Sequence, residues 1–481
     1  MGDSQKKQID MFSREVYRKR RSVLLDRMKG QGGLALFMGN SNSPAQGANN
    51  AYPFRQDSGF LYYFGLDVPD LAATLDLDSG EAVIYGDDLS LDDIIWTGPM
   101  PSVREMAESV GVFATAPAGD LEAVLARARN AGRQVHFLPT ARTSNALKMG
   151  ALLGRNPHDF LPGGKAGSPT ASTALVRAVI SQRLVKGEEE IASIDAACDA
   201  AFEMHTVARE SIRPGASERD IFGRMADVAS ARGWGFSFQT ILTEHGEIFH
   251  CTSRDARLTP GRLALVDAGL ESDDHYASDF TRTYPVSGRF TPRQRDIYKI
   301  VCDCHDLAFE LAAPGVSYYD VHNKVAARML EDLSALGLVG GGIDDMLENG
   351  IAGLFLPHGL GHNMGLDDHD MEDYGEDLVG YDPGQSRSTQ PGLGSLRMAR
   401  KLVPGNVVTD EPGIYFIPEL IALWKADGLG RGFVNFSKLE EYLDFGGIRL
   451  EDDLLITDTG VRRLGRRRLP ATPEEIEDAM N

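Results

Sequence analysis

Short apolar runs alternate with amphipathic helical patterns through the first third of the chain. The apolar runs, which predict strands, lie at residues 34–38, 72–77, 81–85 and 135–137. Helical patterns cover residues 13–29 and 120–131. This alternation predicts an α/β domain with a mixed or parallel sheet.

From about residue 180 the order of the patterns changes, with helices first and strands later. Helical patterns cover residues 188–213, 217–232 and much of 292–338, and strand patterns cover residues 263–266, 275–286, 407–416 and 447–457. This order predicts an α+β domain with a mostly antiparallel sheet. A glycine- and serine-containing stretch at 162–172 loosens the pattern before it. We therefore predict two domains, residues 1–180 and 181–481.

Composition narrows the range of partners. The 481 residues carry 42% hydrophobic and 25% charged residues and a formal charge of -21, the balance of a folded protein with an acidic surface. Such a surface argues against nucleic acid or an anionic membrane as the main partner. The arginine-rich segment 462–468 either attracts an acidic partner or forms a solvated surface.

The chain also carries few cysteines and no long apolar segment. It has four cysteines, which implies no disulfide framework and fits a reducing compartment. Cys302, Cys304 and His305 lie in a helical pattern, where residues two apart do not share a face, so a metal site there is not expected. The first residues lack the apolar core of a signal peptide. The sequence therefore predicts a cytoplasmic protein.

Two aspartates flank a polar turn in the second domain. The strand-like run that contains Asp267 and the run that contains Asp279 are separated by Ser272-Asp273-Asp274. A hairpin centred on Asp273 would place Asp267 and Asp279 opposite each other. Like charges in such a pair repel unless a cation lies between them or one is protonated. Two ordinary turn-flanking aspartates are the alternative.

A second pair of acids lies near the end of the chain. Glu411 follows an apolar strand pattern and precedes a Pro-Gly turn, and Glu451 lies in a strand pattern on the same face as Arg449. Acidic side chains within apolar strands are costly unless they are paired or bind a metal. Four such positions in one domain indicate a shared site.

Histidines gather in a glycine-rich segment. His358 and His362 lie within residues 356–365, which are closed by Asp368-His369-Asp370. The glycines disfavour a helix, so we expect a tight loop that brings imidazoles together; a surface loop with incidental histidines is the alternative. The sequence has no His-Glu-x-x-His zinc helix and no Gly-x-Ser-x-Gly elbow.

These motifs, in this order, resemble the pita-bread metallopeptidases, specifically aminopeptidase P and prolidase. The resemblance covers nearly the whole chain and includes an N-terminal run, residues 52–65, that resembles the non-catalytic domain of both enzymes. It implies an α/β N-terminal domain followed by an α+β pita-bread catalytic domain. It also implies a homo-oligomer, because relatives are commonly dimers or tetramers. It also implies proline-containing peptides as substrates.

The resemblance implies a role for each matching residue. Asp279 and Glu451 would bridge two divalent ions, with Asp267 completing one ion and His362 and Glu411 the other. Manganese is the expected metal, because the ligand set is rich in oxygen, although zinc or cobalt could occupy it. The substrate site would be lined by His250, His358 and His369, and Arg449 would support the ligand carboxylates without binding the metal.

The implied reaction is hydrolysis of the bond before proline. Two metal ions would activate a water molecule, Glu411 would accept its proton, and His358 or His369 would stabilise the oxyanion. We expect an aminopeptidase that acts on longer peptides. Arg397 resembles the prolidase residue that binds a dipeptide carboxylate, so an Xaa-Pro dipeptidase is the alternative. A non-catalytic peptide-binding module is a remote one, because such relatives lose metal ligands.

Overall fold

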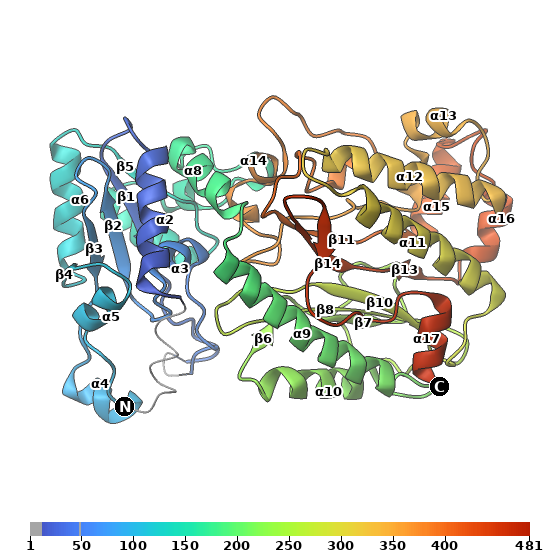
Figure 1. Cartoon of the computed structure of the whole chain (residues 1–481), viewed down its shortest axis with the longest axis horizontal. Coiled ribbons are helices and arrows are strands. Elements are labelled where there is room, and N and C mark those ends of the chain that lie inside the picture. The colour runs from blue at the N-terminus through green and yellow to red at the C-terminus, as the bar shows by residue number, and fades with distance from the viewer. Residues whose placement is uncertain (1–11, 48–49) are drawn as a thin grey trace. The chain divides into compact units, whose positions relative to one another are not determined.

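The computed structural model of the chain describes residues 12–47 and 50–481 (Figure 1). The chain divides into two compact units, Met1–Arg183 with Met371–Val379 and Leu184–Asp370 with Gly380–Asn481. Over the described residues, we find no helix with the length and apolar content needed to cross a membrane.

A five-stranded mixed sheet forms the centre of the first unit, in the order β4-β3-β2-β1-β5. Strand β1 pairs antiparallel with β2 and parallel with β5, which confirms the predicted α/β pattern and its strands. The strands are β1 (Leu34–Met38), β2 (Ala72–Asp76), β3 (Ala82–Tyr85), β4 (Ala114–Ala116) and β5 (Val135–Phe137). The helices of this unit are α2 (Arg14–Arg27), α3 (Ser58–Phe64), α4 (Leu91–Thr97), α5 (Val103–Ser109), α6 (Asp120–Asn130), α7 (Thr143–Leu153) and α8 (Thr173–Arg183).

Helix α3 carries the aromatic core of this unit. The Asp57 side chain accepts a hydrogen bond from the Phe60 amide and so begins the helix. Gly65 ends it in the left-handed conformation, at φ 61°, where an added Cβ would lie 2.0 Å from the Tyr17 ring. All seven residues except Ser58 are buried. The apolar run that the sequence shows here is therefore a packed helix.

The second unit places strands between two pairs of helices (Figure 1). Helices α9 and α10 lie along one side and α11 and α12 along the other. The helices are α9 (Glu188–Ser211), α10 (Glu218–Ser230), α11 (Pro292–Leu311), α12 (Tyr318–Ala335), α13 (Ile343–Glu348), α15 (Pro418–Asp427), α16 (Phe436–Leu439) and α17 (Pro473–Met480). The short helix α14 (Glu376–Gly380) lies where the chain passes between the units.

The strands of the second unit form small sheets with antiparallel pairing. They are β6 (Gly235–Phe236), β7 (Ile241–Thr243), β8 (Leu263–Ala268), β9 (Leu270–Glu271), β10 (Phe280–Pro285), β11 (Val407–Asp410), β12 (Gly413–Tyr415), β13 (Gly447–Arg449), β14 (Asp452–Ile456) and β15 (Val461–Arg463). Every residue of β8, β10, β11 and β14 is buried. Charged residues on these strands therefore need partners inside the protein.

The register of the aspartate hairpin differs from the prediction. Asp267 pairs with Thr281, not with Asp279. The hairpin turn is centred on Asp274, because His275 adopts the left-handed conformation at φ 63° and completes a three-residue loop. Asp279 lies two residues from Thr281, so it is a diagonal neighbour of Asp267 on the same face. The predicted direct pairing is wrong, but the two carboxylates still share a face.

The arginine-rich segment is bound by acids of the same chain. Three of its arginines form ion pairs with helix α9, at intervals of one helical turn: Arg462 with Asp195 at 2.7 Å, Arg466 with Asp199 at 2.6 Å and Arg467 with Glu203 at 2.8 Å. The acidic partner that the segment attracts is thus its own chain.

Helix α11 separates the two neighbouring cysteines, as expected. The Cys302 thiol donates to the Ala471 carbonyl at 3.0 Å, whereas the Cys304 thiol faces the Val325 carbonyl at 3.8 Å. The two sulfur atoms therefore have different surroundings and do not form one site.

Candidate metal centre

One cavity of about 760 Å³ in the second unit brings the predicted residues together. Apolar side chains from Phe238, Ile241 and Phe249 form part of its wall. All ten residues singled out from the sequence line it: Asp267, Asp279, His362, Glu411, Glu451, His250, His358, His369, Arg397 and Arg449. His250 is the most exposed of the histidines in the set.

Four carboxylates reach the cavity from strands and strand ends. Asp267 lies in β8, Asp279 directly before β10, Glu411 directly after β11, and Glu451 between β13 and β14. The Glu451 amide donates to the Thr281 carbonyl at 3.0 Å, which fastens two of these segments together. Asp267, Asp279 and Glu451 are 7%, 4% and 2% exposed. Strands of separate small sheets thus hold four acids around one space.

The glycine-rich segment is an irregular loop, as predicted, and it lies against β11. The His362 amide donates to Thr409 Oγ1 at 3.0 Å, and the Thr409 amide donates to the His362 carbonyl at 3.0 Å. Gly361 is required there, because an added Cβ would lie 2.0 Å from the Thr409 carbonyl oxygen. His362 Nε2 then lies 3.4 Å from Asp279 Oδ2.

A buried ion pair anchors the far end of the loop. Lys186 Nζ lies 3.1 Å from Asp370 Oδ2, and both side chains are only 1% exposed. Removing one member of such a pair would leave an uncompensated buried charge. The pair fixes Asp370 and therefore also His369, which directly precedes it. The His362 and His369 rings lie 4.2 Å apart.

A chain of hydrogen bonds connects His358 to the acids through Tyr415, a residue that sequence reasoning missed. His358 Nδ1 lies 2.8 Å from the Gly359 carbonyl, which can only accept, so Nδ1 carries the proton and Nε2 accepts from the Tyr415 hydroxyl at 2.7 Å. Arg449 donates to the same hydroxyl at 2.9 Å and to Asp267 Oδ2 at 2.5 Å. No local signal indicates Tyr415, because it lies in β12, beyond the Pro-Gly turn that follows Glu411.

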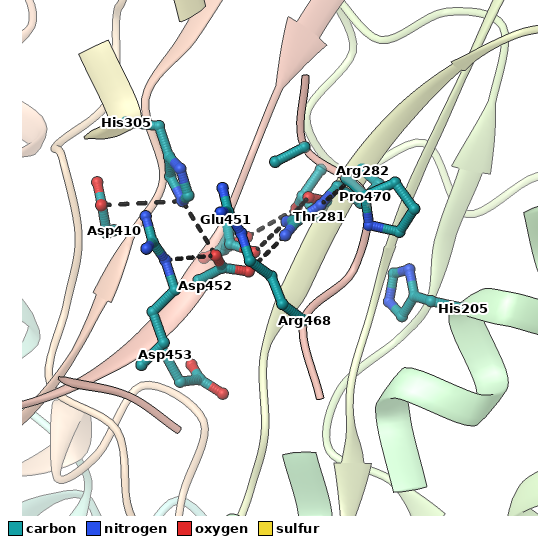
Figure 2. A network of polar contacts seen from close by, with 12 residues as sticks. His205, Thr281, Arg282, His305, Asp410, Glu451, Asp452, Asp453, Arg468 and Pro470 are labelled. Carbon is teal, nitrogen blue, oxygen red and sulfur yellow. Dashed lines mark hydrogen bonds and ion pairs between the residues drawn. The ribbon is translucent and has the colours of Figure 1, made fainter. Parts of the chain in front are cut away.

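A second network lies behind Glu451 (Figure 2). Thr281 Oγ1 donates to Glu451 Oε2 at 2.7 Å. Arg282 is fully buried and donates to the Glu451 carbonyl at 2.8 Å and to Asp452 Oδ1 at 2.6 Å. His305 lies on the other side of Asp452, at 3.5 Å, and burial lowers its pKa to about 3. Thr281 and Arg282 thereby fix the side chain and the backbone of Glu451.

The cavity gathers carboxyl groups that ionise less readily than usual. Burial raises the pKa of Asp267 and of Asp279 to about 6, and it raises the pKa of Glu411 to about 8 although Arg449 opposes the shift. Burial and then the neighbouring Asp279 raise the pKa of Glu451 well above its usual value. These carboxylates would ionise more readily if a cation lay among them.

The donor set fits divalent cations. Asp267 Oδ1 and Asp279 Oδ1 are buried and have no hydrogen-bond partner among the residues that the structure describes. Single ligand atoms of Asp279, His362 and Glu451 all lie within 4.8 Å of one another. Carboxylate oxygens with one imidazole are suitable ligands for manganese and zinc.

Comparison with known proteins agrees with this geometry. Residues 192–458 match the model of metallopeptidase family M24, and residues 17–136 match the aminopeptidase P N-terminal domain. The chain is 30% identical over 478 residues to an Xaa-Pro aminopeptidase of Escherichia coli, covering 98% of both chains. It is 29% identical over 457 residues to an Xaa-Pro dipeptidase of Homo sapiens, covering 93% of this chain and 89% of the relative.

A solved structure of an aminopeptidase P matches the chain over nearly its whole length. The zinc-substituted aminopeptidase P of Escherichia coli in complex with product aligns with a TM-score of 0.76 and 29% identity, and the alignment covers 98% of both chains. The predicted fold, an aminopeptidase P N-terminal-like domain followed by a pita-bread catalytic domain, is confirmed. The chain therefore belongs to metallopeptidase family M24.

Proposed function

We propose that this protein is a two-metal Xaa-Pro aminopeptidase, which removes the N-terminal residue from peptides with proline in second position. The observation that carries the proposal is the convergence of four carboxylates and the His362 imidazole on one cavity. The relatives supply the substrate class, since an Xaa-Pro aminopeptidase and an Xaa-Pro dipeptidase both match along most of the chain.

The proposed ligands divide between two divalent ions. Asp279 and Glu451 would bridge them, Asp267 would complete one, and His362 and Glu411 the other. Carboxylate-rich ligation favours Mn²⁺, and the zinc-substituted relative supports Zn²⁺ as a second possibility. When bound, the ions supply a nucleophile at neutral pH by lowering the pKa of water.

The protein's own groups would position the substrate and move protons. Glu411 would accept the proton released at the attacking water and pass it toward the proline nitrogen. His358 has its N–H directed at the Gly359 carbonyl, which favours His369 over His358 as the oxyanion donor. The His358 ring would instead pack beside Glu411, whose Oε2 lies 3.4 Å from its Nδ1.

The dipeptidase alternative depends on Arg397, which lines the cavity beside Ser395. A guanidinium there would bind the carboxylate of an Xaa-Pro dipeptide, whereas an Xaa-Pro-Yaa peptide carries its carboxylate further away. We expect the wild type to cleave both peptide classes. We expect Arg397→Ala to lower kcat/KM for the dipeptide by about 10–100-fold, the loss of a charged hydrogen bond, and to change tripeptide cleavage much less.

The measurement is the initial rate on one Xaa-Pro and one Xaa-Pro-Yaa peptide with the same first residue, for both proteins. Arg400→Ala is a matched control, because Arg400 lies three residues away and does not line the cavity. Cleavage confined to dipeptides in the wild type would exclude the aminopeptidase and support the dipeptidase.

We also propose that the protein is a homo-oligomer that uses helix α4. No residue of α4 is buried, and Leu91, Ile95 and Trp96 are 76%, 69% and 80% exposed. Such a cluster of large apolar side chains marks an interaction surface, and a second copy of the same surface would cover it. Light scattering should give a multiple of the 52.4 kDa chain mass, reduced in Trp96→Ser. A monomeric wild type would contradict this.

A cytoplasmic location completes the proposal. Its support is that Cys198, Cys251, Cys302 and Cys304 are all free thiols, as is usual in a reducing compartment.

A further inference from the structure

Asp368 is an acid in the cavity that the five proposed ligands do not include. It lies in the loop between His362 and His369 and lines the same wall. Single ligand atoms of His362, Asp368 and His369 lie within 4.8 Å of one another. His362 also belongs to the group with Asp279 and Glu451, so Asp368 stands beside the proposed cation pair and not at a separate place.

Within residues 12–47 and 50–481, the ion-pair partner of Asp368 is a histidine and not a lysine or arginine. Its carboxyl group contacts that of Asp279, and its Oδ1 is buried with no hydrogen-bond partner among the described residues. The His369 imidazole is 4.0 Å from its Oδ2. Asp370, two residues further on, differs because Lys186 pairs with it.

Two carboxyl groups in contact are stable only if a proton or a cation lies between them. Asp279 Oδ1 is itself buried and without a hydrogen-bond partner in the described part of the chain, and Asp279 is 4% exposed. An oxygen ligand is thus available on each of the two neighbouring carboxyl groups, and His362 has a ligand atom within 4.8 Å of one on each of them.

We propose that Asp368 is a sixth protein ligand of the metal centre and binds the ion that His362 binds. This inference rests on the proposed function, because it presumes the metal pair. An added carboxylate raises the coordination number available to that ion and increases the share of oxygen atoms among its ligands. The site should then favour Mn²⁺, which accepts six oxygen-rich ligands, over tetrahedral Zn²⁺.

Metal binding by the full-length chain tests the proposal. Metal-free protein is titrated with Mn²⁺ and separately with Zn²⁺, and bound metal is measured by equilibrium dialysis with elemental analysis. We expect Asp368→Asn to weaken binding of one Mn²⁺ by about 10–100-fold and to weaken Zn²⁺ binding less. Asp367→Asn makes the same charge change one residue away at a position that does not line the cavity, so it should bind Mn²⁺ as the wild type does.

Thermal unfolding gives a second readout that a merely structural role would not produce. Asp368→Asn removes a like charge from Asp279, so the metal-free variant should unfold at the same temperature as the metal-free wild type or a higher one. With saturating Mn²⁺ the order should reverse, because the variant gains less from binding. A variant that is less stable without metal, or that binds Mn²⁺ within about twofold of the wild type, would overturn the proposal.

These outcomes are separable from the proposed peptidase activity. If the wild type binds two ions and Asp368→Asn binds one of them weakly, the ligand role stands even if neither protein cleaves Xaa-Pro peptides. If the wild type cleaves such peptides and Asp368→Asn binds Mn²⁺ unchanged, the peptidase stands and the ligand role fails.

Discussion

Replacing Asp279 by asparagine is expected to lower kcat on an Xaa-Pro-Yaa peptide by about 10³-fold or more, with the fold intact. Asp279 is the proposed bridge between the two ions, and loss of an ion removes several kcal/mol of transition-state stabilisation, at one factor of ten per 1.4 kcal/mol. The fold should persist because the amide of residue 279 still donates to Asp453 Oδ2, at 2.9 Å. Peptide hydrolysis and circular dichroism measure the two effects.

The matched control is Asp273→Asn in the turn of the same hairpin. Asp273 is exposed, and its Oδ1 accepts a hydrogen bond from the Trp234 indole at 2.7 Å, which an asparagine oxygen also accepts. This control should keep wild-type activity. An Asp279→Asn protein that keeps more than roughly a tenth of wild-type kcat would count against a bridging ligand at this position.

Removal of metal by a chelator should abolish activity and make stability fall with rising pH. Burial places the pKa of Asp267 and of Asp279 at about 6 and that of Glu411 at about 8 in the metal-free protein. The carboxyl groups of an unfolded chain have pKa values of about 4. The folded state therefore keeps protons that the unfolded state has released, and stability is lost as pH rises through 6 and then 8. Added Mn²⁺ should restore activity and remove most of this loss.

Urea unfolding at pH 5, 6, 7 and 8, with and without Mn²⁺, measures the effect. The free energy of unfolding of the chelated protein should decrease through the series, and the difference between loaded and metal-free protein should widen. Activity that survives exhaustive chelation, or a metal-free protein that becomes more stable from pH 6 to pH 8, would contradict a cation-binding role for these acids.

Most elements could be predicted from sequence because local pattern determines them. Strand β1 and helix α6 lie where the apolar runs and the helical periodicity place them. Strand β4 was not predicted, because its three half-buried residues form no apolar run. The hairpin register could not be predicted, since it depends on His275 in a left-handed conformation that a residue with a Cβ seldom adopts.

The candidate site was predicted from residue types in unusual places, such as acids within apolar strands. Tyr415, Thr281 and Arg282 were missed because each looks ordinary in its own strand. Their hydrogen bonds to His358 and Glu451 join segments that are 57 to 170 residues apart. Such partners follow from tertiary packing alone. Asp368 belongs to the histidine-rich loop, but nothing local distinguishes it from Asp370, which Lys186 neutralises.

The hydrogen bond from Arg282 to Pro470 has a consequence for biosynthesis. Its Nε donates to the Pro470 carbonyl at 2.9 Å, while its other nitrogens hold the strands behind Glu451. Domains generally fold during synthesis as their residues leave the ribosome. A nascent chain that has not yet released residue 470 lacks this support. The support of Glu451 should therefore stay incomplete until the segment around residue 470 has been synthesised and has packed against Arg282.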